Sequence, residues 1–253
     1  MQPFPWKTFT PHFLPPQHVS WKSFQRELTR AHQALALYQH PVSSLALARE
    51  AIDSLYPIRV SPQRFLHSPR LKKYAPILHY QQALKNALCR TKHRPITKAL
   101  LCRLHAKIKQ GELPANKLGT YRQEPNWIGP EGKGPEEAYY FPPSEKLIPS
   151  LMNNLISYTN SQEKDPLVHI AIIIAQLLII HPYIDGNGRV ARMLIPILLI
   201  QHGFPPLFLS TYFKRHRLKY FHRLYAITSE RAWEEWILFF LKGISSTIKN
   251  PEK

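Results

Sequence analysis

The sequence predicts an all-α protein, and two observations lead to this fold class. Apolar residues recur at helical spacing along most of the chain, as at Phe24, Leu28, Ala31 and Leu35. The only β-prone stretches flank a glycine- and proline-rich turn within residues 111–143. We therefore expect a helical bundle that carries one short β-hairpin.

The individual elements follow from these apolar repeats and from residues that begin or end helices. Thr97 is a suitable N-cap for one helix, and Ser210 or Thr211 for another. Gly203 is a suitable terminator, and Pro196 is expected to bend the helix that Gly203 ends. The prediction is an extended arm at 1–20, helices at 21–38, 42–54, 71–88, 98–109, 143–157, 167–180, 193–202, 212–227 and 233–244, and a proline-rich loop at 57–69.

The formal net charge of +18 is the unusual bulk property of this 253-residue chain. Such a charge is typical of proteins that meet nucleic acid, anionic membranes or acidic partners. The basic residues are scattered, however, without a run of five or six and without an arginine-rich tail. We therefore favour a basic, solvated surface or a preference for acidic partners over a nucleic-acid groove, which the sequence leaves open.

Neither the cysteines nor the apolar segments point to export or to a membrane. Cys89 and Cys102 lack metal-ligand and redox spacing, which predicts reduced thiols. The apolar segment 167–180 is shorter than the roughly twenty residues that span a bilayer, so we expect a buried core helix. Residues 1–16 are interrupted by prolines and lack the apolar core of a secretory signal. These features predict a cytoplasmic protein, and the sequence leaves export into another cell open.

One polar segment, 181–192, lies between two of the predicted core helices and reads His-Pro-Tyr-Ile-Asp-Gly-Asn-Gly-Arg-Val-Ala-Arg. Its Gly186, Asn187 and Gly188 predict a turn that leads into a helix. The first N–H groups of a helix have no partner within the helix, and together with the helix dipole they bind phosphate. The segment is therefore a candidate phosphate site.

Charged side chains surround this turn. Arg189 and Arg192 stand three residues apart on one helix face, and two guanidinium groups suit more than one phosphate. Asp185 is a hard oxygen ligand suited to Mg²⁺ that bridges substrate phosphates. His181 is the group of this segment that can take a proton near neutral pH. Together they describe in-line attack by a hydroxyl on a metal-bound nucleotide phosphate.

Each of these features also has a plain structural interpretation. A histidine at a helix end, a Gly-Asn-Gly turn and a pair of arginines are each more often structural or solvated than functional. Their occurrence together between two buried helices favours ligand binding, because enclosing that much charge is unfavourable without a partner.

The segment resembles the signature of the Fic family, usually His-Pro-Phe-x-Asp/Glu-Gly-Asn-Gly-Arg-x-x-Arg, with Tyr183 in place of the commoner phenylalanine. Other segments resemble the family's flap region and its C-terminal helices, namely Tyr121-Arg122, 126–129, 140–143, 210–217 and 233–236. The resemblance implies the Fic fold, a helical bundle with a short β-hairpin flap over the active site. It divides the chain into an N-terminal helical extension, 1–110, and a Fic core, 111–253, with the flap at 119–143 and the signature loop at 181–192.

Fic proteins typically transfer AMP from ATP to a hydroxyl of a target protein. The resemblance therefore implies a Mg²⁺-dependent protein adenylyltransferase whose acceptor is a serine, threonine or tyrosine of a partner protein. By this resemblance, His181 is the general base and Asp185 holds Mg²⁺ against the α- and β-phosphates. Asn187 and the amides of its turn contact the α-phosphate. Arg189 faces the β-phosphate, and Arg192 faces the γ-phosphate.

Two further contacts are implied by the resemblance. Gln176 and Tyr220 resemble residues that line the nucleoside pocket. The backbone of the flap is expected to pair with the target protein as an added strand. The flap residues that resemble this pairing segment are Ala138, Tyr139, Tyr140 and Phe141.

Many Fic proteins carry an inhibitory helix, Ser/Thr-x-x-x-Glu-Gly/Asn, whose glutamate pairs with the second signature arginine. Ser54 resembles the serine of this motif, but Ile58 stands in the place of the glutamate and Arg59 in that of the glycine. Pro57 would also break such a helix. We therefore expect an enzyme without the usual intramolecular brake, in which Arg192 is free for the γ-phosphate.

Two other classes of function are left open. One is a related enzyme that transfers a different nucleotidyl or phosphoryl group or that removes AMP, because the signature does not distinguish these reactions. The other is a non-enzymatic basic scaffold for nucleic acid or anionic lipid, suggested by the +18 charge. The sequence does not identify the target protein, the nucleotide preference or the oligomeric state, and a homo-oligomer is left open.

Overall fold

The computed structural model describes residues 8–39, 42–55, 61–66, 74–130 and 132–250. Short 3-10 helices cover Trp21–Ser23, Ala115–Lys117, Pro135–Glu137 and Glu145–Leu147. The α-helices are α1 Gln25–Leu37, α2 Ser44–Ser54, α3 Pro62–Leu66, α4 Ala75–Arg90, α5 Lys98–Lys109, α6 Ile148–Thr159, α7 Pro166–Ile180, α8 Asn187–Gln201, α9 Ser210–Arg215, α10 Arg217–Glu230 and α11 Trp233–Lys249. The predicted helical fold is confirmed.

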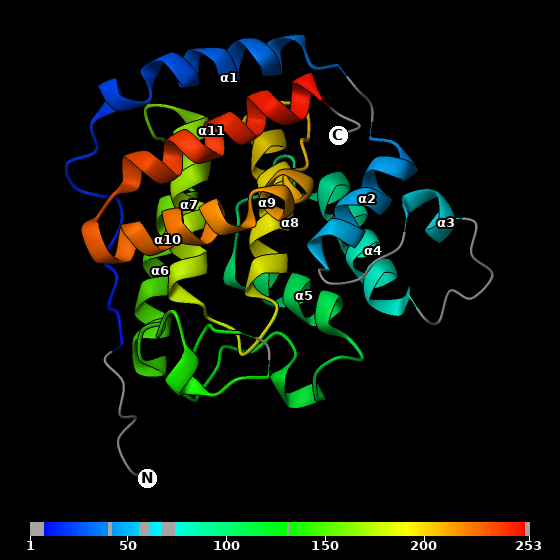
Figure 1. Ribbon diagram of the computed structural model, residues 1–253. Helices are drawn as coiled ribbons and strands as arrows, with labels where there is room; N and C mark the ends of the chain where they lie inside the picture. The colour runs from blue at the N-terminus through cyan, green and yellow to red at the C-terminus, as the bar shows by residue number, and fades with distance from the viewer. Residues whose placement is uncertain (1–7, 40–41, 56–60, 67–73, 131, 251–253) are drawn as a thin grey trace.

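Helices α7 and α8 form the centre of the molecule and pack side by side (Figure 1). Helix α6 packs on α7, and α11 crosses α7 with α1 lying along its outer side. On the opposite side, α2 and α4 pack together, and both α4 and α5 contact α8. The loop that joins α7 to α8 therefore lies at one end of the central pair, within reach of elements from both halves of the chain.

The sequence of α7 explains its central position. The side-chain oxygen of Asp165 accepts hydrogen bonds from the backbone nitrogens of Leu167 and Val168, at 2.9 and 3.2 Å, which begins the helix. Every residue from 167 to 180 is buried, and all but His169 and Gln176 are apolar, as expected for a core element. Among the described residues, no helix combines the length and the apolar character that crossing a membrane requires.

Several element boundaries differ from the sequence prediction. Helix α8 starts at Asn187, six residues before the predicted start, because its first turn is polar and carries no apolar repeat. The helix predicted at 212–227 is divided at His216, whose backbone leaves the helical region at φ −105° and ψ 33°. Helix α3 lies inside the loop predicted at 57–69, and the remainder of that loop is only partly described.

The predicted β-hairpin of the flap is not confirmed. Within the described part of the flap, one isolated antiparallel bridge joins Ile128 to Tyr140. The backbone nitrogen of Ile128 donates to the Tyr140 carbonyl at 2.9 Å, and the Tyr139 nitrogen donates to the Ile128 carbonyl at 2.8 Å. In the described part of the flap the pairing extends no further, and a 3-10 helix at Pro135–Glu137 precedes the bridged segment.

The central position of α7 predicts a large difference between two leucine-to-alanine substitutions. Leu177 is 0% exposed in α7, whereas Leu218 is 80% exposed on α10. We expect Leu177→Ala to lower the free energy of unfolding by about 2–5 kcal/mol, because it leaves a cavity in the core. Leu218→Ala should change it by less than about 0.5 kcal/mol. Urea unfolding monitored by circular dichroism measures both, and equal losses would contradict the packing described here.

Candidate active site

The signature loop is shaped by two residues with left-handed backbone conformations. His181 ends α7 with φ 50°, and its backbone nitrogen donates to the Leu177 carbonyl at 3.0 Å. Gly186 precedes α8 with φ 87°, a conformation that glycine adopts without strain. Between them the chain reverses, so the end of α7 and the start of α8 lie at the same end of the helix pair.

The buried side chain of Asn187 stabilises this loop through hydrogen bonds to its backbone. Asn187 is 1% exposed, and its Oδ1 accepts a hydrogen bond from the Tyr183 nitrogen at 2.9 Å. Its Nδ2 donates to the Tyr183 carbonyl at 2.8 Å. The amide of Asn187 thus satisfies both backbone groups of one loop residue, while its predicted contact with the α-phosphate stays a prediction.

Arg122 joins the flap to the signature loop. Its side chain is buried, and Nε donates to the His181 carbonyl at 2.9 Å while NH1 donates to the Glu124 carbonyl at 3.0 Å. NH2 donates to the Pro143 carbonyl at 2.5 Å, and the Arg122 backbone nitrogen donates to the Pro182 carbonyl at 2.8 Å. One guanidinium therefore links both ends of the flap to the loop, a role that the sequence did not reveal.

His181 is half-buried and neutral at pH 7. Its Nδ1 lies 3.3 Å from the Leu178 carbonyl oxygen. Since a carbonyl only accepts hydrogen bonds, this contact places the proton on Nδ1 and leaves the Nε2 lone pair available. Burial lowers the pKa of His181 to about 4, and the positive charge of Arg122 acts in the same direction. The imidazole can therefore accept a proton at neutral pH.

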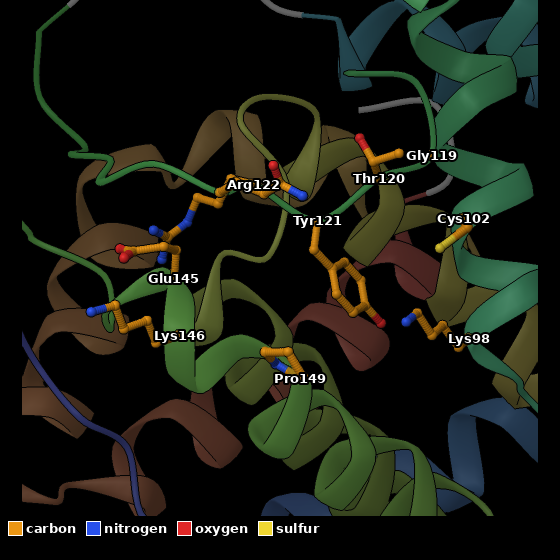
Figure 2. Close-up of a pocket in the computed structure, with 10 residues that line it drawn as sticks. Lys98, Cys102, Gly119, Thr120, Tyr121, Arg122, Glu145, Lys146 and Pro149 are labelled. Atoms are coloured by element: carbon orange, nitrogen blue, oxygen red, sulfur yellow. The ribbon is translucent and has the colours of Figure 1, made fainter. Parts of the chain in front are cut away.

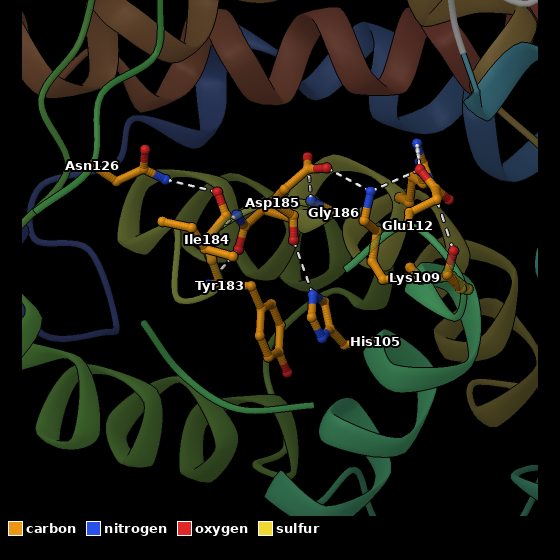
Figure 3. A network of polar contacts seen from close by, with 11 residues as sticks. His105, Lys109, Glu112, Asn126, Tyr183, Ile184, Asp185 and Gly186 are labelled. Carbon is orange, nitrogen blue, oxygen red and sulfur yellow. Dashed lines mark hydrogen bonds and ion pairs between the residues drawn. The ribbon is translucent and has the colours of Figure 1, made fainter. Parts of the chain in front are cut away.

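Asp185 and Arg189 belong to a chain of four alternating charges, of which Figure 3 labels Asp185, Lys109 and Glu112. Lys109 Nζ at the end of α5 lies 2.5 Å from Asp185 Oδ2 and 2.8 Å from Glu112 Oε2. The Glu112 carboxylate in turn contacts Arg189 with both oxygens, Oε1 to NH1 at 2.5 Å and Oε2 to NH2 at 2.9 Å. Neither Lys109 nor Glu112 was predicted from the sequence as a site residue.

The pKa values of the two carboxyl groups follow from these contacts. Burial raises the pKa of Asp185, but the hydrogen bond and charge of Lys109 outweigh it, so the pKa lies below its ordinary value. The pKa of Glu112 is lowered in the same way, with burial opposed by Arg189 and Lys109. Both carboxylates are therefore ionised at neutral pH.

His105 supports the loop from α5. Its ring stacks on Tyr183 with a centroid distance of 3.9 Å. Its Nε2 donates to the Asp185 carbonyl at 2.9 Å, and its Nδ1 accepts from the Gly119 nitrogen at 2.8 Å. Burial lowers the pKa of His105, in agreement with a neutral ring that donates through one nitrogen and accepts through the other.

Arg192 contacts Ser54, and its availability for the γ-phosphate stays a prediction. Its NH2 donates to the Ser54 carbonyl at 2.8 Å, and its Nε lies 3.4 Å from Ser54 Oγ. Gly188 leaves room for this arrangement, because a Cβ there would lie 2.9 Å from Arg192 NH1. Ile58 and Arg59 lie outside the described residues, so the absence of the inhibitory glutamate stays a prediction.

A buried carboxylate lies behind this contact. Glu50 is 2% exposed and accepts hydrogen bonds from Ser210 Oγ at 2.6 Å and from Tyr80 Oη at 3.1 Å. Burial raises the pKa of Glu50, while the hydrogen bond from Ser210 and the charge of Arg192 oppose the rise. The second signature arginine therefore faces a polar pocket built by α2, α4 and α9.

The other predicted contacts have different surroundings. Gln176 is 1% exposed, and its Nε2 donates to the His12 carbonyl at 2.9 Å, so its amide holds the N-terminal arm. Tyr220 is 6% exposed; burial raises its pKa and the charge of Arg192 opposes the rise, which indicates a hydroxyl near that arginine. The nucleoside contacts of both residues stay predictions.

The flap segment is held from two sides. The Tyr140 hydroxyl donates to the Ile179 carbonyl at 2.9 Å, and the Phe141 carbonyl accepts from the Phe9 nitrogen at 3.0 Å. Tyr139 is 70% exposed, whereas Ala138 is only partly exposed. Strand pairing of this segment with a target protein stays a prediction.

A cavity of about 600 Å³ lies beside the start of the flap (Figure 2). The Tyr121 ring points into it, and Lys98 Nζ lies 5.0 Å from the ring centroid. The described residues that line it include Lys98, Cys102, Tyr121, Arg122, Glu145 and Lys146, and none of its lining residues belongs to the signature loop. The cavity therefore adjoins the signature loop through Arg122 without being lined by it.

Asp185 fits a Mg²⁺ site of the kind that uses one protein carboxylate. Mg²⁺ is commonly held by one or two carboxylates together with water and substrate phosphates. The Asp185 side chain is ionised and 62% exposed, beside the phosphate-binding candidate Arg189. In the described part of the chain, no cluster of three acidic, histidine or cysteine side chains could hold a metal by itself, so phosphates would have to complete the site.

Sequence reasoning did not identify His105, Lys109 and Glu112 as site residues, and the sequence holds only a weak signal for the first two. Leu101, His105 and Lys109 are spaced four apart in α5, and all three are buried. Polar residues on an apolar helix face indicate a buried partner, but the sequence does not say which partner. Glu112 follows a turn after the helix, and nothing in its local pattern indicates a contact with Arg189, which is 77 residues away.

Solved structures place this arrangement in the class of Fic folds. A Fic family protein from Desulfovibrio desulfuricans G20 aligns with a TM-score of 0.72 at 15% identity, over 94% of this chain and 76% of that one. IbpAFic2 in complex with adenylylated Cdc42 aligns with a TM-score of 0.59 at 16% identity, over 91% of this chain and 71% of that one. At these identities the likeness shows the fold.

The sequence identifies the family more directly. Residues 95–199 match the model of the Fic/DOC family, so the chain carries a Fic/DOC domain. Protein adenylyltransferase Fic from Aedes aegypti is 29% identical over 159 residues, which make up 61% of this chain and 29% of that protein. The chain thus spans less than a third of this relative's length. The family-model match begins at residue 95, before the predicted domain boundary at residue 110, and that boundary stays a prediction.

The environment of His181 predicts its titration. Since burial lowers its pKa to about 4, the imidazole should stay neutral as the pH falls through 6.5 and should take a proton only near pH 4. Nuclear magnetic resonance of ¹⁵N-histidine-labelled protein, with the His181→Ala protein used to assign the signal, measures this directly. A midpoint between pH 6 and 7 would contradict the buried, neutral imidazole.

Proposed function

We propose that this protein is a protein adenylyltransferase, which transfers AMP from ATP to a serine, threonine or tyrosine hydroxyl of another protein. The observation that carries the proposal is that one loop brings together a neutral His181, two arginines and the start of α8. His181 is the proton acceptor, the arginines and the start of α8 form the anion site, and one loop separates the two. The name of the Aedes aegypti relative, protein adenylyltransferase Fic, supports the same reaction.

The proposed reaction balances as a single displacement. The target hydroxyl attacks the α-phosphorus of ATP, a new P–O bond forms, and the bond from the α-phosphorus to the bridging oxygen breaks. Pyrophosphate leaves, and the hydroxyl proton passes to Nε2 of His181, which the contact of Nδ1 with Leu178 leaves unprotonated. The first N–H groups of α8 are proposed to hold the α-phosphate, and Arg189 and Arg192 the outer phosphates.

We further propose that Asp185 holds Mg²⁺ when ATP is bound. The ion would supply positive charge to the phosphates, and His105 would keep the loop in place through its hydrogen bond to the Asp185 carbonyl. The target segment is proposed to lie along Ala138–Phe141, where the exposed Tyr139 is available for contact.

The proposed reaction is tested with ATP labelled at the α-phosphate and a cell extract as the source of target proteins. We expect protein-bound label with the unaltered protein and a loss of about a hundredfold or more with His181→Ala, because the general base is removed. His93→Ala is the matched control, since His93 lies exposed in a turn. Label that persists in His181→Ala, or that arrives only from the γ-phosphate, would contradict the proposal.

A further inference from the structure

Glu112 holds Arg189 in the way that a phosphate would. A guanidinium binds carboxylates and phosphates through the same two-pronged geometry. Both Glu112 oxygens contact the Arg189 guanidinium, at 2.5 and 2.9 Å, and one of them also lies 2.8 Å from Lys109 Nζ. The carboxylate therefore marks a point where an anion is held by two cations at once.

The Lys109 side chain is much more enclosed than the Glu112 carboxylate. The Lys109 side chain is 3% exposed, and its stem packs against Gly186, where a Cβ would lie 3.0 Å from Lys109 Cγ and Cδ. Glu112 is 23% exposed and lies in the turn that follows α5, after Gly111 with φ 81°. Glu112 therefore has solvent beside it into which its side chain can turn, whereas the Lys109 stem fills the space beside Gly186.

The charges also favour replacement of the Glu112 carboxylate by a nucleotide phosphate. With Glu112 in place, the two carboxylates, Asp185 and Glu112, cancel the charges of Lys109 and Arg189. A nucleoside triphosphate is strongly anionic and gains little electrostatic binding energy from a neutral cluster. When Glu112 turns away, the cluster becomes cationic, and the phosphate recovers the contacts that the carboxylate gives up.

We propose that Lys109 and Arg189 together form a phosphate subsite for the outer phosphates of the nucleotide, which Glu112 fills when no nucleotide is bound. This inference rests on the proposed function, because it concerns the same nucleotide. It assigns Lys109 as a further phosphate-binding residue and Glu112 as an intramolecular competitor. Glu112 thus restrains the first signature arginine, whereas the inhibitory helix of other Fic proteins restrains the second.

The proposal is tested by calorimetric titration of ATP and of AMP into variants of the His181→Ala protein, at fixed salt and Mg²⁺. Glu112→Gln should bind ATP about three to ten times more tightly, because the competing charge is gone. Lys109→Met should bind ATP about tenfold more weakly, because a charged phosphate contact is lost. Neither change should alter AMP binding by more than about twofold, since AMP lacks the outer phosphates.

Two matched variants control for net charge. Glu235→Gln removes another glutamate–arginine pair, with Arg223, and Lys117→Met removes another lysine–glutamate pair, with Glu124. Either test variant that binds ATP as its control does, or that changes AMP and ATP binding equally, overturns the proposal. Glu112→Gln predicts a gain of affinity, which a misfolded protein cannot give, so the test holds even where Lys109→Met fails to fold.

The same titrations separate this proposal from the proposed function. If ATP binds, label is transferred in the α-phosphate assay, and the test variants bind ATP as their controls do, then only the subsite proposal is overturned. Failure of ATP to bind any variant overturns the adenylyltransferase proposal and the subsite together.

Discussion

Two largely buried helices, α7 and α8, must be joined by a polar loop whose backbone groups need partners, and the rest of the site is built around that junction. Helices α7 and α8 contribute most of the central core, and unpaired polar groups at their junction would be unfavourable there. Asn187 pairs with the Tyr183 backbone and Arg122 with the His181 carbonyl, so the loop is held by side chains instead of by regular structure. A loop fixed in this way presents the start of α8 and its arginines in one orientation, which suits a phosphate site.

The N-terminal half of the chain reaches both signature arginines. Arg189 is held by Glu112, which follows α5, and Arg192 by Ser54 at the end of α2. The two contacts come from different helices, and they leave the arginines satisfied in the protein without a ligand. Any anion that binds the signature loop must therefore compete with groups of the chain itself, so nucleotide affinity reflects these internal contacts as well as the direct ones.

The sequence predicted the helical fold because apolar repeats and caps are local signals, and Thr97 and the buried helix at 167–180 are examples. It also pointed to the signature residues, because their order along the chain is itself the pattern, and their roles in the site stay predictions. It did not predict the partners of Asp185 and Arg189, since a contact between α5 and α8 depends on packing and leaves no periodicity in either segment. The predicted hairpin is not confirmed, because the β-prone residues of the described flap make one isolated bridge and a 3-10 helix lies between its two ends, which local β propensity did not reveal.

The anion held between Lys109 and Arg189 is a carboxylate of the chain, and it is proposed to give way to a nucleotide phosphate. A crystal structure of the His181→Ala protein with ATP and Mg²⁺ tests it most directly. We expect a phosphate oxygen within hydrogen-bond distance of both Lys109 Nζ and the Arg189 guanidinium, with the Glu112 side chain turned away. A structure in which ATP occupies the signature loop while Glu112 still contacts Arg189 with both oxygens would contradict it.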